Sequence, residues 1–217
     1  MTTVIVCSGG PKHEIPSLNN YRQLKDVVFI GADKGSVYLL EQGIIPDEIV
    51  GDFDSLSTDE WVKVSKEVKN ISRVQPEKDD TDTDLALEKA LFYHPTEIIL
   101  TGVTGGRLDH FESALRSMYR LQLKNLHIQI KLINRNNEIQ FLFPGTHSID
   151  FREQYKYLSF FAYEQIVKDV TLRGVKYETT NECIEIGTSR FTSNELNSLE
   201  GYISFSSGIC LMIRSSD

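Results

Sequence analysis

The chain has 217 residues and a formal net charge of −8, with 40% hydrophobic and 25% charged side chains. This is the composition of an ordinary folded protein with enough apolar surface for a core, which excludes a disordered or fibrous chain. The sequence contains no basic tract that would neutralise the phosphates of DNA or RNA, which argues against a nucleic-acid surface.

The first predicted element is a buried strand at Thr3–Ser8, and its short, uncharged sequence does not resemble a secretory signal. No apolar run approaches the roughly 20 residues that a membrane span requires. Cys7, Cys183 and Cys210 are widely spaced, which suggests neither a disulfide framework nor a zinc site. We therefore expect a cytoplasmic protein.

Short apolar runs alternate with amphipathic stretches through the first half of the chain. The expected strands are Thr3–Ser8, Val27–Ala32, Glu97–Thr101 and Ile128–Asn134, and the expected helices are Ser36–Gln42, Thr58–Lys69, Asp84–His94 and Leu108–Leu121. This alternation predicts a Rossmann-like α/β domain with a mostly parallel sheet covered on both faces. In such a domain the loops that follow the strands form the ligand crevice.

The pattern changes near Phe143, where closely spaced short strands begin. The expected strands are Tyr157–Tyr163, Val167–Leu172, Cys183–Ile186, Tyr202–Ser206 and Ile209–Ile213, with a helical turn around Asn194–Leu199. Such spacing predicts an antiparallel sandwich or barrel-like domain. We therefore expect two domains, an α/β domain over 1–138 and an all-β sandwich over 139–217.

Two aspartates, Asp52 and Asp54, follow the short apolar run Glu48–Val50. If the segment is extended, residues two apart point the same way, so both carboxylates aim at one point and need a cation or a proton between them. Magnesium, which prefers a few carboxylates together with phosphate oxygens, is the natural cation. The alternative is a strand end with Asx turns ahead of a helix at Thr58.

A second group of acids lies between Pro76 and Asp84. Its members are Glu77, Asp79, Asp80, Asp82 and Asp84. Acids at a helix N-terminus interact well with the dipole, and Thr81 is a natural capping residue. That alternative accounts for one or two acids, whereas five like charges repel one another unless some of them bind a metal.

A glycine-rich segment, Thr101–His110, follows a predicted strand and opens a predicted helix. Its backbone N–H groups can face a phosphate, and Arg107 can bind phosphate oxygens through two nitrogens, although a plain loop is the alternative. Two earlier strands also end in glycine-containing loops, Ser8–Pro11 and Gly31–Gly35. Together, the acids, the arginine and the glycines indicate magnesium-dependent transfer of a phosphoryl or pyrophosphoryl group.

In order and approximate spacing, these motifs resemble those of the thiamine pyrophosphokinase family. The matching segments are Gly31–Gly35, Gly51–Ser55, Asp79–Asp82 and Gly105–Asp109, followed by Leu172–Tyr177, Gly187–Ser189 and Thr192–Glu195. The resemblance therefore covers nearly the whole chain. It implies magnesium-dependent transfer of a pyrophosphoryl group from ATP to the hydroxyl of thiamine, giving AMP and thiamine diphosphate. It also implies an N-terminal catalytic domain, a C-terminal thiamine-binding β-sandwich, and a homodimer with active sites between subunits.

The resemblance also assigns roles by position. It implies that Asp52, Asp54 and Asp82 are catalytic and hold magnesium together with Asp79, with Asp52 as the preferred acceptor of the thiamine hydroxyl proton. The implied ATP and phosphate contacts are Asp33, Lys34, Lys78, Thr81, Gly105, Gly106 and Arg107, and the implied thiamine contacts are Asp109, Ser193 and Asn194. Lys78 stands where some relatives have a glutamine. An aromatic partner for the thiamine rings is expected, without a residue assigned to it.

Two other functions fit part of this pattern. The Asp52-x-Asp54 motif is similar to that of haloacid-dehalogenase-like phosphotransferases, whose first aspartate forms a phosphoenzyme, but those chains usually carry it on the first strand. A non-enzymatic sensor of nucleotide or thiamine diphosphate is the other, and it gives little reason to cluster so many acids. A covalent phosphoaspartate would identify the first, and turnover with magnesium and ATP would exclude the second.

Overall fold

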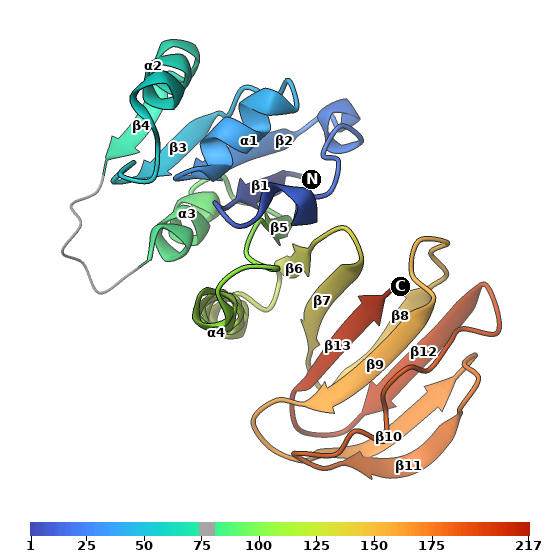
Figure 1. Cartoon of the computed structure of the whole chain (residues 1–217). Coiled ribbons are helices and arrows are strands. Elements are labelled where there is room, and N and C mark those ends of the chain that lie inside the picture. The colour runs from blue at the N-terminus through green and yellow to red at the C-terminus, as the bar shows by residue number, and fades with distance from the viewer. Residues whose placement is uncertain (74–80) are drawn as a thin grey trace. The chain divides into compact units, whose positions relative to one another are not determined.

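The computed structural model describes residues 1–73 and 81–217, and it divides the chain into two compact units, Met1–Arg135 and Asn136–Asp217 (Figure 1). Among the described residues, no helix combines the length and the apolar character needed to cross a bilayer. The expected α/β first half and antiparallel β second half are both confirmed.

In the described residues of the first unit, six parallel strands follow the order β4-β3-β2-β1-β5-β6. Their bounds are β1 Thr3–Cys7, β2 Val27–Ala32, β3 Glu48–Gly51, β4 Asn70–Arg73, β5 Glu97–Thr101 and β6 Gln129–Ile133. Every residue of the central strand β1 is buried, as expected for a parallel strand whose two faces are both covered. The edge strand β4 has no apolar pattern and three of its four residues are exposed, so the sequence did not predict it.

The α-helices that the structure describes between these strands are α1 Gly35–Glu41, α2 Thr58–Glu67, α3 Asp82–Leu91 and α4 Leu108–Lys124. Two short 3-10 turns, Lys12–Glu14 and Tyr21–Gln23, precede β2. Both α2 and α3 begin with a capping box, formed by Ser57 with Glu60 and by Thr81 with Asp84. Because Thr81 is the N-cap, α3 begins two residues earlier than expected, and Asp82 becomes its first residue.

The second unit contains two antiparallel sheets, ordered β7-β13-β9 and β11-β10-β12-β8. The strands are β7 Asn137–Leu142, β8 Gly145–Asp150, β9 Tyr157–Ala162, β10 Val167–Arg173, β11 Thr179–Ile184, β12 Glu200–Phe205 and β13 Cys210–Ser215. Phe160 and Met212 of the first sheet and Leu172 and Ile203 of the second belong to one hydrophobic core. The two sheets therefore share their apolar faces.

Several strands of this unit differ from the sequence prediction. β7 and β8 were not predicted, because polar and charged residues interrupt their apolar pattern. Glu138 on β7 is 4% exposed as a side chain, and it is paired with Arg152 (Nη1–Oε2 2.5 Å) and with the equally buried Arg214. The predicted helical turn at Asn194–Leu199 is wrong: the segment forms isolated β-bridges, Leu158–Asn194 and Val175–Leu196. β11 begins four residues before the predicted Cys183.

Candidate active site

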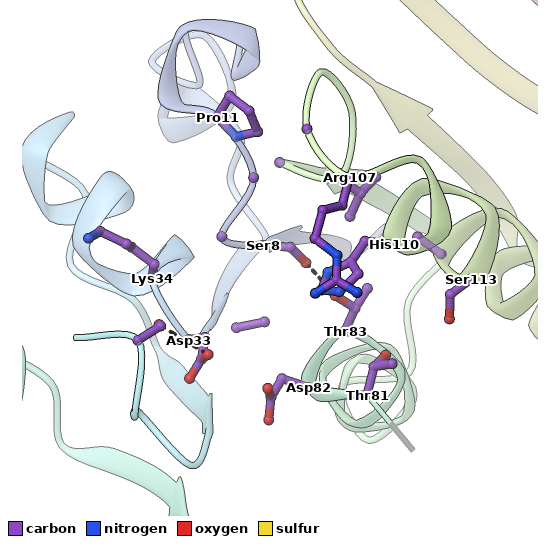
Figure 2. Close-up of a pocket in the computed structure, with 18 residues that line it drawn as sticks. Ser8, Pro11, Asp33, Lys34, Thr81, Asp82, Thr83, Arg107, His110 and Ser113 are labelled. Carbon is purple, nitrogen blue, oxygen red and sulfur yellow. Dashed lines mark hydrogen bonds between the residues drawn. The ribbon is translucent and has the colours of Figure 1, made fainter. Parts of the chain in front are cut away.

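A cavity of about 420 Å³ lies at the carboxyl ends of β1, β2 and β5 (Figure 2). Because the strands are parallel, the loops that follow them meet at one edge of the sheet. The cavity is lined by Ser8–Pro11 after β1, by Ala32 at the end of β2 with Asp33 and Lys34 after it, and by Gly102, Val103, Gly106 and Arg107 after β5, together with Ser55, Thr81–Thr83, His110, Ser113 and Ala114. All of these residues belong to the first unit.

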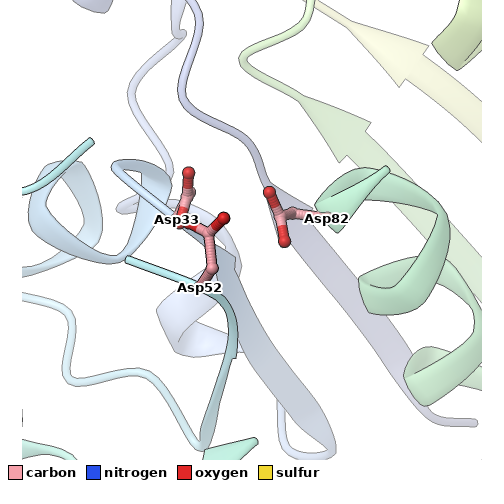
Figure 3. Close-up of side chains that lie close together, drawn as sticks. All are labelled: Asp33, Asp52 and Asp82. Carbon is pink, nitrogen blue, oxygen red and sulfur yellow. The ribbon is translucent and has the colours of Figure 1, made fainter. Parts of the chain in front are cut away.

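Three carboxylates converge beside this cavity. Asp33, Asp52 and Asp82 each offer a carboxylate oxygen, and these oxygens all lie within 4.8 Å of one another (Figure 3). The three residues follow β2, follow β3 and begin α3, respectively. Strand order therefore brings together acids from three separate segments of the chain.

Asp33 organises the loop that carries Asp52. Its own N–H donates to Val50 O (2.9 Å), its Oδ1 accepts the N–H of Phe53 (3.0 Å), and its Oδ2 accepts the hydroxyl of Ser55 (3.1 Å). A Cβ at Gly51 would lie 2.6 Å from Asp33 Oδ1, and Gly51 has φ of 148°. The close approach of the carboxylate to the loop therefore requires glycine there.

Asp52 and Asp54 do not lie along an extended segment. Strand β3 ends at Gly51, and Phe53 has φ of 63°, with its ring buried against Trp61 at 4.9 Å between centroids. Asp52 Oδ1 accepts the N–H of Asp54 (2.9 Å), which is the Asx turn that the sequence left as the alternative. Asp52 thus forms the turn and also joins the acid cluster. Asp54 is exposed, and in the described part of the chain it is not among the three clustered carboxylates.

The electrostatics of the cluster reflect this convergence. Burial, together with the charges of Asp33, Asp52 and Asp54, raises the pKa of Asp82 to about 6. Burial also raises the pKa of Asp33, and the hydrogen bonds from Phe53 and Ser55 partly offset that rise. A proton or a hard cation would relieve this repulsion, and an all-oxygen donor set of this kind suits Mg²⁺.

Two positively charged side chains, Arg107 and Lys34, also line the cavity. Arg107 donates to Asp109 through Nε (3.1 Å) and Nη2 (2.5 Å), and this pairing lowers the pKa of Asp109 to about 2. Both side chains are exposed, so the pair is solvated and Arg107 can change partners. Asp109 holds Arg107 and is not among the residues that line the cavity, nor is Gly105. Lys34 lines the cavity, with its Nζ 3.5 Å from Glu60 Oε1.

Some cavity residues were not predicted as site residues: Ser8, Ser55, Thr83, His110 and Ser113. Each lies within or beside a motif that the sequence did single out. Ser8 ends the first strand, where an α/β fold places ligand loops. His110 lies one helical turn from Arg107, so it shares a face with it. Strand ends and helical spacing were therefore the signals that pointed to these residues.

The other predicted residues differ in what the structure shows of them. Asp79 and Lys78 fall outside the described residues. Ser193 and Asn194 belong to the second unit, where Ser193 is exposed with φ of 57°. Asn194 is 5% exposed, and its side chain accepts the N–H of Tyr177 (2.9 Å) and donates to Tyr177 O (3.0 Å). Thr81 lines the cavity and caps α3 through its hydroxyl.

Comparisons with known proteins agree across both units. Family models described as "Thiamin pyrophosphokinase, catalytic domain" and "Thiamin pyrophosphokinase, vitamin B1 binding domain" match residues 21–130 and 146–210. The thiamine pyrophosphokinase of Bacillus subtilis (strain 168) is 42% identical over 217 residues, which are 100% of both chains.

Two crystal structures of relatives show the same fold. That of thiamine pyrophosphokinase from Bacillus subtilis has a TM-score of 0.93 at 40% identity and covers 100% of both chains. That of thiamin pyrophosphokinase from Geobacillus thermodenitrificans has a TM-score of 0.88 at 38% identity, covering 100% of this chain and 98% of the other.

Proposed function

We propose a reaction for this chain, which belongs to the thiamine pyrophosphokinase family and is an enzyme of that activity with ATP as co-substrate. In this Mg²⁺-dependent reaction a pyrophosphoryl group is transferred from ATP to the hydroxyl of thiamine, giving thiamine diphosphate and AMP. The observation that carries this reaction is the convergence of Asp33, Asp52 and Asp82 beside the cavity. Family membership sets aside the dehalogenase-like and sensor interpretations.

The carboxylates fit a magnesium site. Asp33, Asp52 and Asp82 present oxygen donors from three separate segments, and the negative charges of the neighbours of Asp82, which together with burial raise its pKa to about 6, support a bound cation or proton there. Asp54, whose charge acts on both Asp33 and Asp82, would complete the negative field, and Asp79 would add to it. When bound, Mg²⁺ supplies neutralisation of the polyphosphate charge and fixes its orientation.

The rest of the reaction belongs to the chain's own groups. Arg107, released from Asp109, would bind polyphosphate oxygens through its planar guanidinium, with Lys34, Lys78, Thr81, Gly105 and Gly106 as further phosphate contacts. The hydroxyl oxygen of thiamine attacks the β-phosphorus, the bond between that phosphorus and the α,β-bridging oxygen breaks, and AMP leaves. Asp52 accepts the hydroxyl proton. Its Oδ1 is oriented by the N–H of Asp54, which leaves Oδ2 for this step.

The second unit would bind thiamine. We propose that Asn194 acts through Tyr177, because its buried amide binds both the N–H and the carbonyl oxygen of Tyr177, while Tyr177 as a residue is 60% exposed. An exposed aromatic ring on a fixed backbone suits stacking against thiamine's rings. Ser193 and Asp109 would be polar contacts to the same substrate.

The proposal extends to domains, assembly and location. We assign the catalytic role to a Rossmann-like domain over 1–138 and thiamine binding to a β-sandwich over 139–217; the six parallel strands and the two sheets with one core support this. The resemblance supports a homodimer with active sites at the subunit interface. Cys7, Cys183 and Cys210 are free thiols, which supports a reducing cytoplasm.

Product analysis tests the reaction directly. We expect incubation with ATP, thiamine and Mg²⁺ to give AMP and thiamine diphosphate in equal amounts, without early ADP, because the α,β bond is the one that breaks. Time-resolved chromatography of nucleotides and thiamine esters measures both. ADP appearing in step with product would show transfer of a single phosphoryl group and would overturn the pyrophosphokinase reaction.

The raised pKa of Asp82 predicts how stability depends on pH. Because the pKa of Asp82 in the folded state, about 6, lies above the usual aspartate pKa of 3.8, the folded state binds this proton more tightly. The proton therefore stabilises the fold fully below about pH 4, and this stabilisation is lost as the pH rises through about 6. We expect the free energy of unfolding of the metal-free protein to fall by about 1 kcal/mol relative to Asp82→Asn over that range, after allowing for solvent screening.

Urea unfolding of both proteins at pH 4 and pH 7.5 measures this difference. Mg²⁺ should reverse the loss, so it should raise the melting temperature of the wild type more at pH 7.5 than at pH 5, and should raise that of Asp82→Asn less. If the free energies of unfolding of the wild type and of Asp82→Asn change equally between pH 4 and pH 7.5, Asp82 is not the carboxylate with the raised pKa.

A further inference from the structure

Two hydroxyl groups meet at the wall of the cavity, next to the acid cluster. Ser8 Oγ and Thr83 Oγ1 lie 2.9 Å apart and share a hydrogen bond in which either can be the donor (Figure 2). Ser8 ends β1 and Thr83 directly follows Asp82 on α3, and both line the cavity. Neither position is explained by the magnesium or thiamine contacts.

The backbones that carry these hydroxyls are fixed independently of each other. The N–H of Ser8 donates to Thr101 O (2.8 Å), and its carbonyl packs so closely that a Cβ on Gly102 would lie 2.2 Å away. Thr83 lies within the capping box of α3, whose Asp84 also accepts from Arg120 (3.1 Å). The bond between the two hydroxyls is therefore not needed to hold either segment in place.

The chemistry of the pair leaves one hydrogen unused. Each hydroxyl has a single hydrogen, and the shared bond consumes only one of the two. Neither oxygen makes another side-chain hydrogen bond within residues 1–73 and 81–217. One O–H group is thus available on the cavity wall that also includes Arg107, and a hydrogen bond from it to an anionic oxygen is charge-assisted.

We propose that the Ser8–Thr83 pair is a donor for the polyphosphate group of the bound nucleotide, a role that rests on the proposed function and adds two residues to its phosphate site. Either hydroxyl can give the outward hydrogen while the other supports it. The pair places this donor beside Asp82. A phosphate oxygen bound to a cation at the acid cluster would therefore contact a neutral O–H donor there and not another carboxylate.

Single and double variants distinguish a pair of phosphate donors from a hydrogen bond that only holds α3 in place. In Ser8→Ala the Thr83 hydroxyl still donates to the ligand, and in Thr83→Val the Ser8 hydroxyl does. We therefore expect each single variant to weaken binding of α,β-methylene-ATP by less than about 3-fold. This analogue cannot transfer its pyrophosphoryl group, because a CH₂ group replaces the α,β-bridging oxygen. The double variant Ser8→Ala/Thr83→Val should weaken this binding by about 10-fold or more, since it removes the last donor. A link that only held α3 would be broken fully by either single change.

Isothermal titration of α,β-methylene-ATP and of AMP, each with and without Mg²⁺, measures these affinities. AMP lacks the β- and γ-phosphates, so its affinity should stay within about 2-fold in every variant, and Thr83→Ser should bind the analogue like the wild type. Thr146→Val, at an exposed position on β8, is the control that shows how the same replacement outside the cavity affects the affinity for the analogue. Should the double variant fail to fold, Ser8→Ala/Thr83→Ala removes the same two hydroxyls.

Equal losses in the single and double variants, or an equal loss for AMP and the analogue, would overturn the donor role. These measurements require neither thiamine nor turnover. If the wild type forms no thiamine diphosphate, the proposed reaction is refuted. The role of the pair is still decided separately, by comparing the affinities of the variants for α,β-methylene-ATP and for AMP.

Discussion

Asp52→Asn is expected to lower kcat by at least about 10²-fold while the chain stays folded. Asparagine keeps the shape of the side chain and can still accept the N–H of Asp54, so the turn is preserved. It removes the charge that meets Asp33 and Asp82, and with it the proposed acceptor of the substrate proton. Steady-state turnover with ATP, thiamine and varied Mg²⁺, beside circular dichroism of the variant, measures both effects.

Asp59→Asn is the matched control, because Asp59 is an exposed acid in the first turn of α2 and its loss should leave turnover unchanged. We expect Asp54→Asn to lower turnover less than Asp52→Asn does, since the Asp54 carboxylate acts on Asp82 through its charge while the backbone N–H that orients Asp52 is kept. An Asp52→Asn enzyme with near-normal kcat and unaltered Mg²⁺ dependence would remove Asp52 from the catalytic role.

Gly102→Ala is expected to destabilise the first unit by about 3 kcal/mol or more. Gly102 follows β5 with φ of 75°, and a Cβ there would lie 2.2 Å from the backbone carbonyl oxygen of Ser8. Backbone cannot rotate away as a side chain would, so either the loop after β1 or the loop after β5 must move. Both loops line the cavity, and activity should fall with stability.

Gly187→Ala separates the two causes of the stability loss in Gly102→Ala, which are the steric contact with Ser8 and the strain of a positive φ. Gly187 has φ of 86°, similar to that of Gly102, but no atom lies within 4 Å of the position its Cβ would take. It should therefore cost only the strain of a left-handed alanine, about 1 kcal/mol. Chemical denaturation of both variants gives the difference. Equal losses at the two positions would show that the contact with Ser8 is not the cause.

Much of the fold follows from local patterns in the sequence. The buried runs that became β1, β2 and β5 and the amphipathic stretches that became α2, α3 and α4 were identified from apolar spacing. The elements that the sequence missed lack such a pattern. Strand β4 is mostly exposed, and β7 carries the buried Glu138, whose charge is compensated by arginines from distant positions. Only long-range pairing makes a charged residue acceptable inside a core.

The sequence by itself determined which segments carry the chemistry, because the acids, the glycines and Arg107 stand at the ends of elements that local periodicity defines. Only the tertiary structure decided which carboxylates meet. The sequence paired Asp52 with Asp54 on the assumption of an extended backbone. In the structure the backbone turns at Phe53, whose N–H is bound by Asp33, a residue 20 positions earlier in the chain. That contact exists because β2 and β3 are neighbours in the sheet, and strand order is set by how all the strands and helices pack together.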